Sequence, residues 1–590
     1  MKKSENIIKF IYLPLFLMTV VSTGCQKQEV NSKPPNVILV ITDDQGYGDM
    51  GYHGNPNVKT PTLDAFARES VRFNDFHVSP VCAPTRSSLM TGRYSLRTGV
   101  RDTYNGGAIM ASSEITLAEI LKKINYKTGI FGKWHLGDNY PSRPTDQGFD
   151  ESLIHLAGGM GQVGDFTNFF KKETSYFDPV LWHNNEQKPY QGYCSDIFTD
   201  QAIDFIEKNH KEPFFCYLSF NAPHTPLQVP DKYYQMYKDT DPSQGIDPTL
   251  LPSSPMSEKN KEDARRVYAM VSNIDDNLNK LLQKLKSLGI QENTIVIFMT
   301  DNGPQQPRYV GGMKGRKSSV YRGGIRVPFF MRYPAKYKGN QDMDQMAAHI
   351  DIVPTISELC GAPLPTDRTI DGRSFLPALR GETLANRSFF SYWTRKFPEM
   401  YNNIALQKGD YKLVGKTDFD APIGEFELYN LRKDPGEQVN LLVQHKEKAT
   451  VLKKEMDGYI NELGRSKNLV NPPRISVGTP HENPVYLNRN DAGGERGVWS
   501  QENIFSYWKV ALEEGEYNLK FKFVKPIPQG GKMSLELGQR IHQKNNAQEA
   551  VDELEWQNIS LPQGSFDFTP FYSKGRSRYF PFWVQITRVN

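Results

Sequence analysis

Two short runs of apolar, largely β-branched residues most constrain the fold of this chain, because each of them ends in acidic residues. Residues 36–41 read NVILVI and are followed, after one threonine, by Asp43 and Asp44. Residues 294–300 read TIVIFMT and are followed by Asp301. Continuous apolar runs of this length are typical of parallel strands that are buried on both faces. We therefore expect an α/β domain in which both runs form central strands of one sheet.

The polar residues after these two strands are candidate metal ligands. Ligands of open α/β sheets bind at the carboxyl ends of the strands, so the two groups are expected to meet there although 257 positions separate Asp44 from Asp301. Carboxylate and amide oxygens are the ligands that Ca²⁺ and Mg²⁺ prefer. Either group alone would also suit a turn with solvated aspartates, and their pairing favours a metal. The predicted oxygen ligands are Asp43, Asp44, Asp301 and Asn302.

A third motif begins at Cys82 and reads CAPTRSSLMTGR. Pro84 near its start and the apolar residues Leu89 and Met90 predict the first turns of a helix. Backbone N–H groups at a helix N-terminus bind anions, and Arg86 would lie one turn from Cys82. Taken alone, the motif is equally compatible with a buried and inert thiol.

The segment that begins at Cys82 resembles the signature of type I sulfatases, in which this cysteine is oxidised to Cα-formylglycine. Residues 128–137, TGIFGKWHLG, resemble the second sulfatase signature. Lys133 and His135 occupy alternate positions after a short strand there, so their side chains are expected to point the same way. The resemblance implies that Lys133 contacts sulfate and the nucleophile, and that His135 assists the release of sulfate from the hydrated aldehyde.

Two later segments extend the resemblance. NAPHTP, at residues 221–226, contains His224, which matches a general acid toward the leaving alcohol. GRKSSVYRGGIRVP, at residues 315–328, contains Lys317, which matches a lysine that binds sulfate. The implied catalytic residues are Cys82, Arg86, Lys133, His135, His224 and Lys317. The implied ligands of Ca²⁺, or alternatively Mg²⁺, are Asp43, Asp44, Cys82, Asp301 and Asn302.

The length and the strand patterns predict several domains, because 590 residues exceed one ordinary core. The resemblance implies an alkaline-phosphatase-like α/β fold over residues 34–395, with a large, mixed and mainly parallel sheet flanked by helices. It also implies a smaller subdomain with an antiparallel sheet over residues 396–470. Residues 472–497 are rich in proline, glycine and asparagine and are interpreted as a linker. Alternating segments such as residues 517–523 predict an extra all-β module over residues 475–590.

The N-terminal residues predict export. Two lysines precede an apolar run at residues 10–21 that is too short for an ordinary membrane span. The small residues that follow end in Gly24-Cys25, which resembles a bacterial lipoprotein signal. We therefore expect residues 1–25 to be a signal peptide with Cys25 as the lipidated residue, and a location in the periplasm or on the outer membrane. Free secretion into the periplasm is the alternative.

The cysteine count and the net charge exclude some classes of protein. Five cysteines in 590 residues do not form a disulfide scaffold. With Cys25 and Cys82 assigned to modification, three remain, and one bridge, such as Cys194 with Cys216 rather than Cys360, stays open. The formal net charge of +4 requires any electrostatic attraction to be local. We predict no nucleic-acid partner and no membrane contact beyond the lipid anchor.

The combined motifs predict a sulfuric ester hydrolase that is exported and acts on sulfated polysaccharides or oligosaccharides. Candidate substrates are algal galactans, ulvan, fucoidan and glycosaminoglycans, and the loop at residues 158–170 is expected to set the specificity. A formylglycine-generating maturation enzyme is the expected protein partner. Two alternatives remain at this point: a phosphoester or phosphonate monoester hydrolase of the same superfamily, and a surface lipoprotein that binds sulfated glycans without cleaving them.

Overall fold

The computed structural model describes residues 33–589 except 251–254, 396–397, 399–400, 418–420, 496 and 547–548. The expected signal peptide and Cys25 therefore lie outside the described residues. Within the described ranges, no helix is both long enough and apolar enough to cross a membrane.

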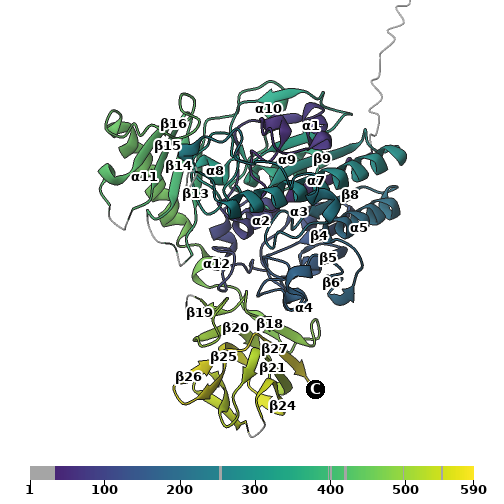
Figure 1. Ribbon diagram of the computed structural model, residues 1–590, viewed down its shortest axis with the longest axis vertical. Coiled ribbons are helices and arrows are strands. Elements are labelled where there is room, and N and C mark those ends of the chain that lie inside the picture. The colour runs from purple at the N-terminus through teal and green to yellow at the C-terminus, as the bar shows by residue number, and fades with distance from the viewer. Residues whose placement is uncertain are drawn as a thin grey trace, which may run out of the picture.

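A ten-stranded mixed sheet forms the centre of the largest domain (Figure 1). Its strand order is β11-β2-β10-β9-β1-β8-β4-β5-β6-β7. The two predicted central strands are confirmed as β1 (Asn36–Thr42) and β9 (Thr294–Thr300), which pair in parallel and are buried along their whole length. β8 (Phe214–Ser219) and β4 (Lys127–Lys133) continue the parallel part on the other side of β1. The mainly parallel sheet of the prediction is therefore present.

Antiparallel pairs occur toward both ends of this sheet, where β10 pairs with β2 and β9, and β6 pairs with β5 and β7. The bounds of these outer strands are β2 (Val71–Phe73), β5 (Glu151–His155), β6 (Val180–His183), β7 (Glu186–Pro189), β10 (Phe329–Arg332) and β11 (Gln341–Met343). A separate short ladder joins β3 (Phe76–His77) to β12 (Ala347–Ala348).

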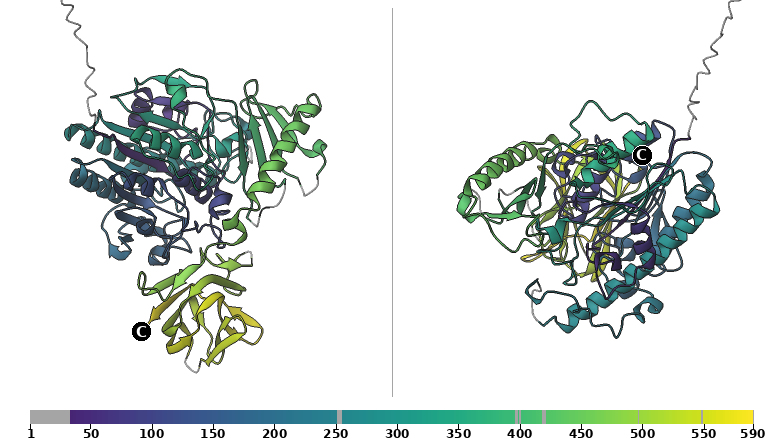
Figure 2. Two further views of the ribbon diagram at one scale, coloured as in Figure 1. Left: turned by 180° about the vertical axis from the view of Figure 1, so that it is seen from behind. Right: turned by 90° about the horizontal axis from the view of Figure 1, so that it is seen from above.

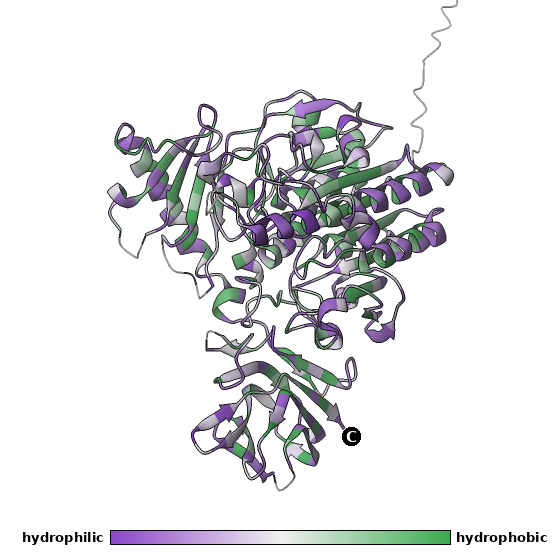
Figure 3. Cartoon of the chain, viewed as in Figure 1, coloured by the Kyte–Doolittle hydropathy of each residue, from purple (hydrophilic) through white to green (hydrophobic). Residues whose placement is uncertain are grey.

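Helices cover both faces of the central sheet, which explains the continuous apolar run of β1. Alternate residues of β1 belong to two different cores: Val37, Leu39 and Ile41 to one, Ile38 and Val40 to the other. The first core includes α2 (Cys82–Thr91), α3 (Leu117–Lys122) and α9 (Ile352–Cys360). The second includes α1 (Pro61–Arg68), α5 (Cys194–Asn209) and α7 (Glu258–Ser287). Figure 3 shows hydrophobic strands at the centre and hydrophilic residues along the outer helices.

Five short helices complete this part of the chain and its connection to the C-terminal module. They are α4 (Phe166–Phe169), α6 (Asp231–Tyr234), α8 (Arg322–Ile325), α10 (Leu376–Leu379) and α12 (Lys467–Val470). α12 lies between the largest domain and the module, so the chain enters the module beside it (Figure 1).

A four-stranded antiparallel sheet forms a smaller subdomain at one side of the largest domain (Figure 2). Its strands are β13 (Ser388–Tyr392), β14 (Ile404–Lys408), β15 (Tyr411–Gly415) and β16 (Glu427–Asn430). The helix α11 (Lys446–Leu463) packs on this sheet through an apolar face that includes Leu452 and Met456. Because β13 precedes residue 395, the sheet takes its first strand from the segment that the sequence placed in the catalytic domain.

The C-terminal module contains two facing sheets, in the orders β17-β20-β25-β22-β23 and β18-β27-β21-β24. A single core lies between them and includes Trp508 and Phe521. The bounds are β17 (Ile475–Val477), β18 (Val485–Asn488), β19 (Gly493–Gly494), β20 (Ser506–Leu512), β21 (Gly515–Ile527), β22 (Lys532–Leu537), β23 (Arg540–Asn545), β24 (Val551–Leu561), β25 (Gly564–Lys574), β26 (Ser577–Tyr579) and β27 (Trp583–Arg588).

The linker predicted for residues 472–497 is wrong, because β17, β18 and β19 lie within it. Its many prolines and glycines mark the turns, while Ile475, Val477, Val485 and Leu487 alternate along the two longer strands and enter the core of the module. The alternation of these four apolar residues indicated strands, but the proline and glycine content of the segment led to its interpretation as a linker.

The bridge left open between Cys194 and Cys216 is absent. The four cysteines of the described residues, Cys82, Cys194, Cys216 and Cys360, are buried and unpaired. The thiol of Cys194 instead donates to Asn221 Oδ1 at 3.4 Å. Burial raises the pKa of Cys194 to about 12, and it also raises the pKa of Cys216. Both thiols are therefore protonated core residues.

Candidate active site

The predicted metal ligands meet at the carboxyl ends of β1 and β9. The backbone N–H of Asp44 donates to Asp301 Oδ1 at 3.2 Å, and Asn302 Nδ2 donates to Asp44 Oδ1 at 2.8 Å. These residues and Asp43 are all buried. The parallel pairing of β1 with β9 therefore brings together side chains that lie far apart in the sequence.

Three oxygen atoms of this group are suited to a cation. Asp43 Oδ1, Asp44 Oδ2 and Asn302 Oδ1 are buried, and within the described part of the chain none has a hydrogen-bond partner. Single ligand atoms of Asp43, Cys82 and Asp301 also lie within 4.8 Å of one another. Buried carboxylate oxygens without a partner are costly, and a hard divalent cation removes that cost. The donor set therefore fits Ca²⁺ or Mg²⁺.

The pKa of Asp301 shows how strongly the carboxylates are crowded. Burial and then the charge of Asp43 raise this pKa to about 7, although Arg86 and Lys133 act to lower it. For Asp44, burial also acts to raise the pKa, but Lys317 and His224 outweigh it and hold the pKa below its usual value. Asp301 therefore gains most from an additional positive charge nearby.

Arg86 forms buried contacts with residues of the site but does not itself line the cavity. It lies in α2, and its guanidinium is completely buried against Asp301 Oδ2, with Nη2 at 2.8 Å and Nε at 3.2 Å. The same group donates to the carbonyl of Lys133 at 3.0 Å and to Ser219 Oγ at 2.6 Å. Arg86 therefore ties the ends of three strands together. Ser219, which ends β8, is a supporting residue that the sequence motifs did not indicate.

The two predicted lysines each pair with one aspartate. Lys133 Nζ lies 2.6 Å from Asp43 Oδ2, and both groups are fully buried. Lys317 Nζ lies 2.6 Å from Asp44 Oδ1. Burial acts to lower the pKa of Lys317, but Asp44 and other nearby groups raise it above its usual value. Lys317 is therefore positively charged in the folded protein, and it lines the wall of the cavity.

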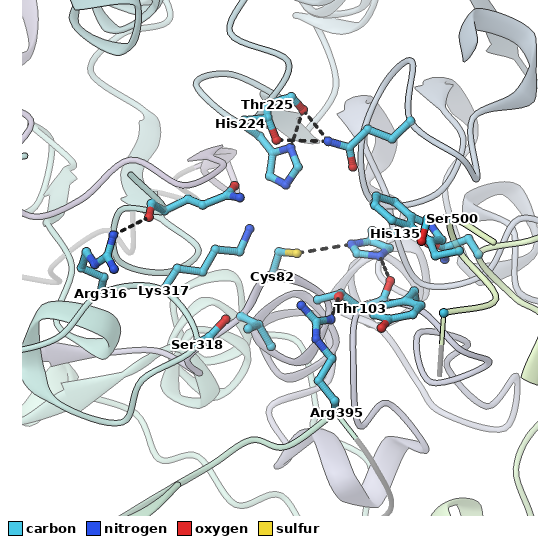
Figure 4. A pocket seen from close by; sticks show the side chains of 18 residues that line it. Cys82, Thr103, His135, His224, Thr225, Arg316, Lys317, Ser318, Arg395 and Ser500 are labelled. Atoms are coloured by element: carbon cyan, nitrogen blue, oxygen red, sulfur yellow. Dashed lines mark hydrogen bonds between the residues drawn. The ribbon is translucent and has the colours of Figure 1, made fainter. Parts of the chain in front are cut away.

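His135 faces Cys82 with an unprotonated ring nitrogen. Its Nε2 lies 2.7 Å from the carbonyl oxygen of Thr103, which can only accept, so Nε2 carries the proton. Its Nδ1 lies 3.5 Å from Cys82 Sγ (Figure 4). Burial and the charge of Lys133 lower the pKa of His135 well below its usual value. The neutral ring thus presents a proton acceptor to residue 82.

His224 lies near the aspartates. Its Nδ1 lies 2.7 Å from the carbonyl oxygen of Thr225 and so carries the proton, which leaves Nε2 at 3.7 Å from Asp44 Oδ2. Burial and Lys317 lower the pKa of His224 to about 3. An anion bound beside Nε2 would favour its protonated form. Asp43, Asp44 and His224 also form a second group with the spacing of metal ligands.

A cavity of about 400 Å³ opens in front of these residues (Figure 4). Its inner end is lined by Cys82, His135, His224 and Lys317, so four of the six predicted catalytic residues meet there. Gly158 and Gln162 of the predicted specificity loop also line it. A Cβ on Gly158 would lie 2.5 Å from Cε1 of His135, so the loop passes directly over that ring.

Further lining residues were missed by the sequence reasoning. They are Val81, Thr103, Tyr104, Thr225, Gln305, Arg316, Ser318, Arg395, Asn490, Gly497, Trp499 and Ser500. Those beyond residue 395 had no local signal, because only the tertiary position of the C-terminal module brings its loops to the cavity.

Two family models match this chain. A model described as Sulfatase matches residues 35–362. A model described as the C-terminal part of N-sulphoglucosamine sulphohydrolase matches residues 316–465. The chain beyond residue 465 lies outside both.

Individual relatives agree with these matches. The chain is 28% identical over 523 residues to an N-acetylgalactosamine-6-O-sulfatase of Bacteroides thetaiotaomicron, covering 74% of this chain and 96% of that one. It is 29% identical over 455 residues to the N-acetylgalactosamine-6-sulfatase of Mus musculus, covering 69% and 82%. The crystal structure of Ps i-CgsB in complex with k-i-k-neocarrahexaose has a TM-score of 0.63 and 27% identity, covering 74% and 94%.

Proposed function

Because this chain belongs to the sulfatase family and is therefore a sulfuric ester hydrolase, we propose that it desulfates polysaccharides or oligosaccharides through a formylglycine made from Cys82. The observation that carries the proposal is the meeting of Cys82, His135, His224 and Lys317 at the inner end of one cavity. Relatives named for N-acetylgalactosamine-6-sulfate esters support a sulfated glycan as the substrate.

The environment of Cys82 favours its role as a precursor over a role as a thiolate. Burial raises the pKa of Cys82 although Lys133 and Lys317 act to lower it. Oxidised to the aldehyde and hydrated, residue 82 supplies one hydroxyl as nucleophile and a second that can expel sulfate. His135 Nδ1, which lies 3.5 Å from Cys82 Sγ, takes the proton of that second hydroxyl.

The charged residues around the cavity bind the sulfate group. Lys317 remains protonated and donates to a sulfate oxygen, and His224 becomes protonated beside the bound anion and donates to the leaving alcohol. Asp43, Asp44, Asp301 and Asn302 would hold Ca²⁺, or alternatively Mg²⁺. When bound, this cation supplies positive charge for the sulfate oxygens and lowers the pKa of the diol.

The test is to measure sulfate release from a panel of defined sulfated oligosaccharides by the wild type and the Cys82→Ala variant. We expect release only by the wild type. The tryptic peptide of residues 73–86 should carry the aldehyde, and a hydrazine reagent should label it. A higher kcat/KM on the phosphate ester of a phenol than on its sulfate ester would favour the phosphoesterase alternative. An unmodified Cys82 in protein from the native host, together with no sulfate release, would favour the binding protein.

We further propose that the protein is exported and anchored through Cys25. The proposal depends on the short apolar run and the Gly24-Cys25 ending of the N-terminal residues. Radiolabelled palmitate should enter the wild type and should not enter the Cys25→Ser variant. Secretion of unlabelled protein into the periplasm would support the soluble alternative.

A further inference from the structure

The C-terminal module forms the outer wall of the active-site cavity. Four residues between β18 and β20 line the same cavity as Cys82; they are Asn490, Gly497, Trp499 and Ser500. In Figure 4, Ser500 lies on the same side of the cavity as His135. Because both family matches end by residue 465, this wall is an addition to the part of the chain that they cover.

Buried contacts hold this wall in place. Arg489, which is 2% exposed, donates to the backbone carbonyls of Gln501 and Pro581 at 2.9 and 3.0 Å. On the catalytic side, Phe169 of the specificity loop packs on Phe582 of the module with ring centroids 4.6 Å apart. The loop and the module therefore support each other, and the wall is formed before a ligand binds.

An aromatic surface and a cation lie at the mouth of the cavity. The rings of Tyr104 and Trp499 pack at a centroid distance of 5.8 Å with an interplanar angle of 39°. The guanidinium of Arg395 lies 4.8 Å from the centroid of Tyr104. Its Nη1 pairs with the buried Asp102 at 3.3 Å, and the arginine side chain remains 41% exposed. Aromatic faces of this kind pack against the C–H groups of a sugar ring, and an exposed guanidinium binds carboxylate or sulfate.

Trp499 also has an unused hydrogen-bond donor. Its Nε1 is buried, and among the described residues it has no acceptor. An unsatisfied buried N–H costs about 1–3 kcal/mol, and this N–H lies below the accessible surface of the protein. The indole of Trp499 therefore offers a sugar its ring face at the cavity.

A second cation lies elsewhere on the wall of the cavity. Arg316 is half-buried and donates to the carbonyl of Gln305 at 3.2 Å. No carboxylate of the described residues lies within ion-pair distance of it. Figure 4 shows Arg316 and Arg395 well apart on either side of Lys317 and Ser318. A substrate that carries an anionic group besides the scissile sulfate can thus bind a guanidinium on either side of Lys317, Arg316 on one side and Arg395 on the other.

From these contacts we infer that Trp499 and Arg395 form a saccharide subsite shared by the module and the catalytic domain. This inference rests on the proposed function. Trp499 packs on a sugar ring of the substrate, and Arg395 binds a second anionic group, either a uronate carboxylate or another sulfate. The module is therefore part of the active site and determines which saccharides are accepted.

The first test measures binding without turnover. The Cys82→Ala variant is titrated calorimetrically with chondroitin, heparin, fucoidan and carrageenan oligosaccharides of defined sulfation. For the best ligand, adding Trp499→Ala should weaken the affinity at least tenfold, whereas Trp499→Phe, which keeps a ring face, should weaken it less. Phe505→Ala is the matched control, because Phe505 is an exposed aromatic of the same segment and does not line the cavity.

The second test separates the two anionic groups. Arg395→Gln should weaken binding at least tenfold for oligosaccharides with a second anion and less than threefold for monosulfated ones. Paired ligands with carboxyl-reduced uronates, or without the second sulfate, identify which anion Arg395 binds. Equal affinities of the Trp499→Ala and parent proteins, or no binding of any oligosaccharide by Cys82→Ala, would overturn the subsite. Sulfate release by the wild type is measured separately, so failure of the proposed function is recognised independently.

Discussion

The inner and outer ends of the cavity are built on different physical principles. At the inner end, fully buried charged groups form ion pairs, as Arg86 with Asp301 and Lys133 with Asp43 show. At the outer end, Tyr104, Trp499 and the partly exposed Arg395 form a surface that is held mainly by contacts between rings and a guanidinium. Buried ion pairs are costly to break, whereas exposed ones contribute little. The inner end is therefore suited to one fixed reaction, and the outer end can change with the substrate.

The largest effect should follow the loss of Cys82, a buried residue at the inner end of the cavity. Cys82→Ala removes the proposed precursor of the nucleophile, and we expect sulfate release to fall by about 10⁴-fold or more. The thermal midpoint should change little, because alanine fits the helix start and forms no buried charge. Sulfate release by ion chromatography and a melting curve check both statements. Residual activity within tenfold of the wild type would contradict the assignment of residue 82.

The next prediction concerns the free energy of unfolding. It compares Arg86 at the inner end of the cavity with Arg395 at the outer end. Arg86→Met leaves Asp301 buried without its cation, which should lower the free energy of unfolding by about 3–5 kcal/mol. Arg395→Gln is the comparison: its partner Asp102 is also buried, but Asp102 keeps hydrogen bonds from Trp393 Nε1 and the Thr103 N–H, so the loss should be smaller than for Arg86→Met. Urea unfolding of both variants provides the measurement. Equal losses would show that the two ends do not differ as described.

Removal of the proposed cation should have an intermediate effect at the inner end. A chelator should lower the thermal midpoint of the Cys82→Ala variant, and added Ca²⁺ should restore it. A cation at 100 times its Kd stabilises the folded state by about 2.7 kcal/mol. Adding Asn302→Ala, which deletes one orphaned oxygen, should weaken this response to Ca²⁺. A midpoint that is insensitive to the chelator and to Ca²⁺ would argue against a cation at the strand ends.

The inner end was predictable from the sequence because its residues follow recognisable strands and motifs. The apolar runs at residues 36–41 and 294–300 placed Asp44 and Asp301 at strand ends. Parallel pairing of the two strands then brings these ends side by side. The carbonyl of Thr103 determines that Nε2 of His135 carries the proton. It was not predictable, because every residue type has a backbone carbonyl. The aromatic wall depends on how the module docks, which no local pattern encodes. Trp499 therefore had no signal before the fold was known.

The smallest effect should come from Asp138 and Asp491, two acidic residues where the module meets the catalytic domain. Burial raises the pKa of Asp491 to about 6, and burial together with Asp491 raises the pKa of Asp138. Asp138 accepts from Asn488 Nδ2 at 2.9 Å. A raised pKa in the folded state means that the protonated form is favoured there. This stabilisation is complete below pH 4 and is lost as the pH rises through about 6.

Asp491→Asn removes one of these charges and should therefore stabilise the protein most at alkaline pH. At pH 8 we expect the free energy of unfolding to rise by about 1–3 kcal/mol relative to the wild type, because the wild type must hold Asp491 ionised in a buried position. At pH 4.5 the difference should fall to roughly a third of its value at pH 8, since the folded wild type is protonated and the unfolded chain only partly so. Urea unfolding at both pH values is the measurement. A difference that is the same at both would mean that Asp491 does not titrate at this interface, and that the contact between the module and the catalytic domain is independent of pH.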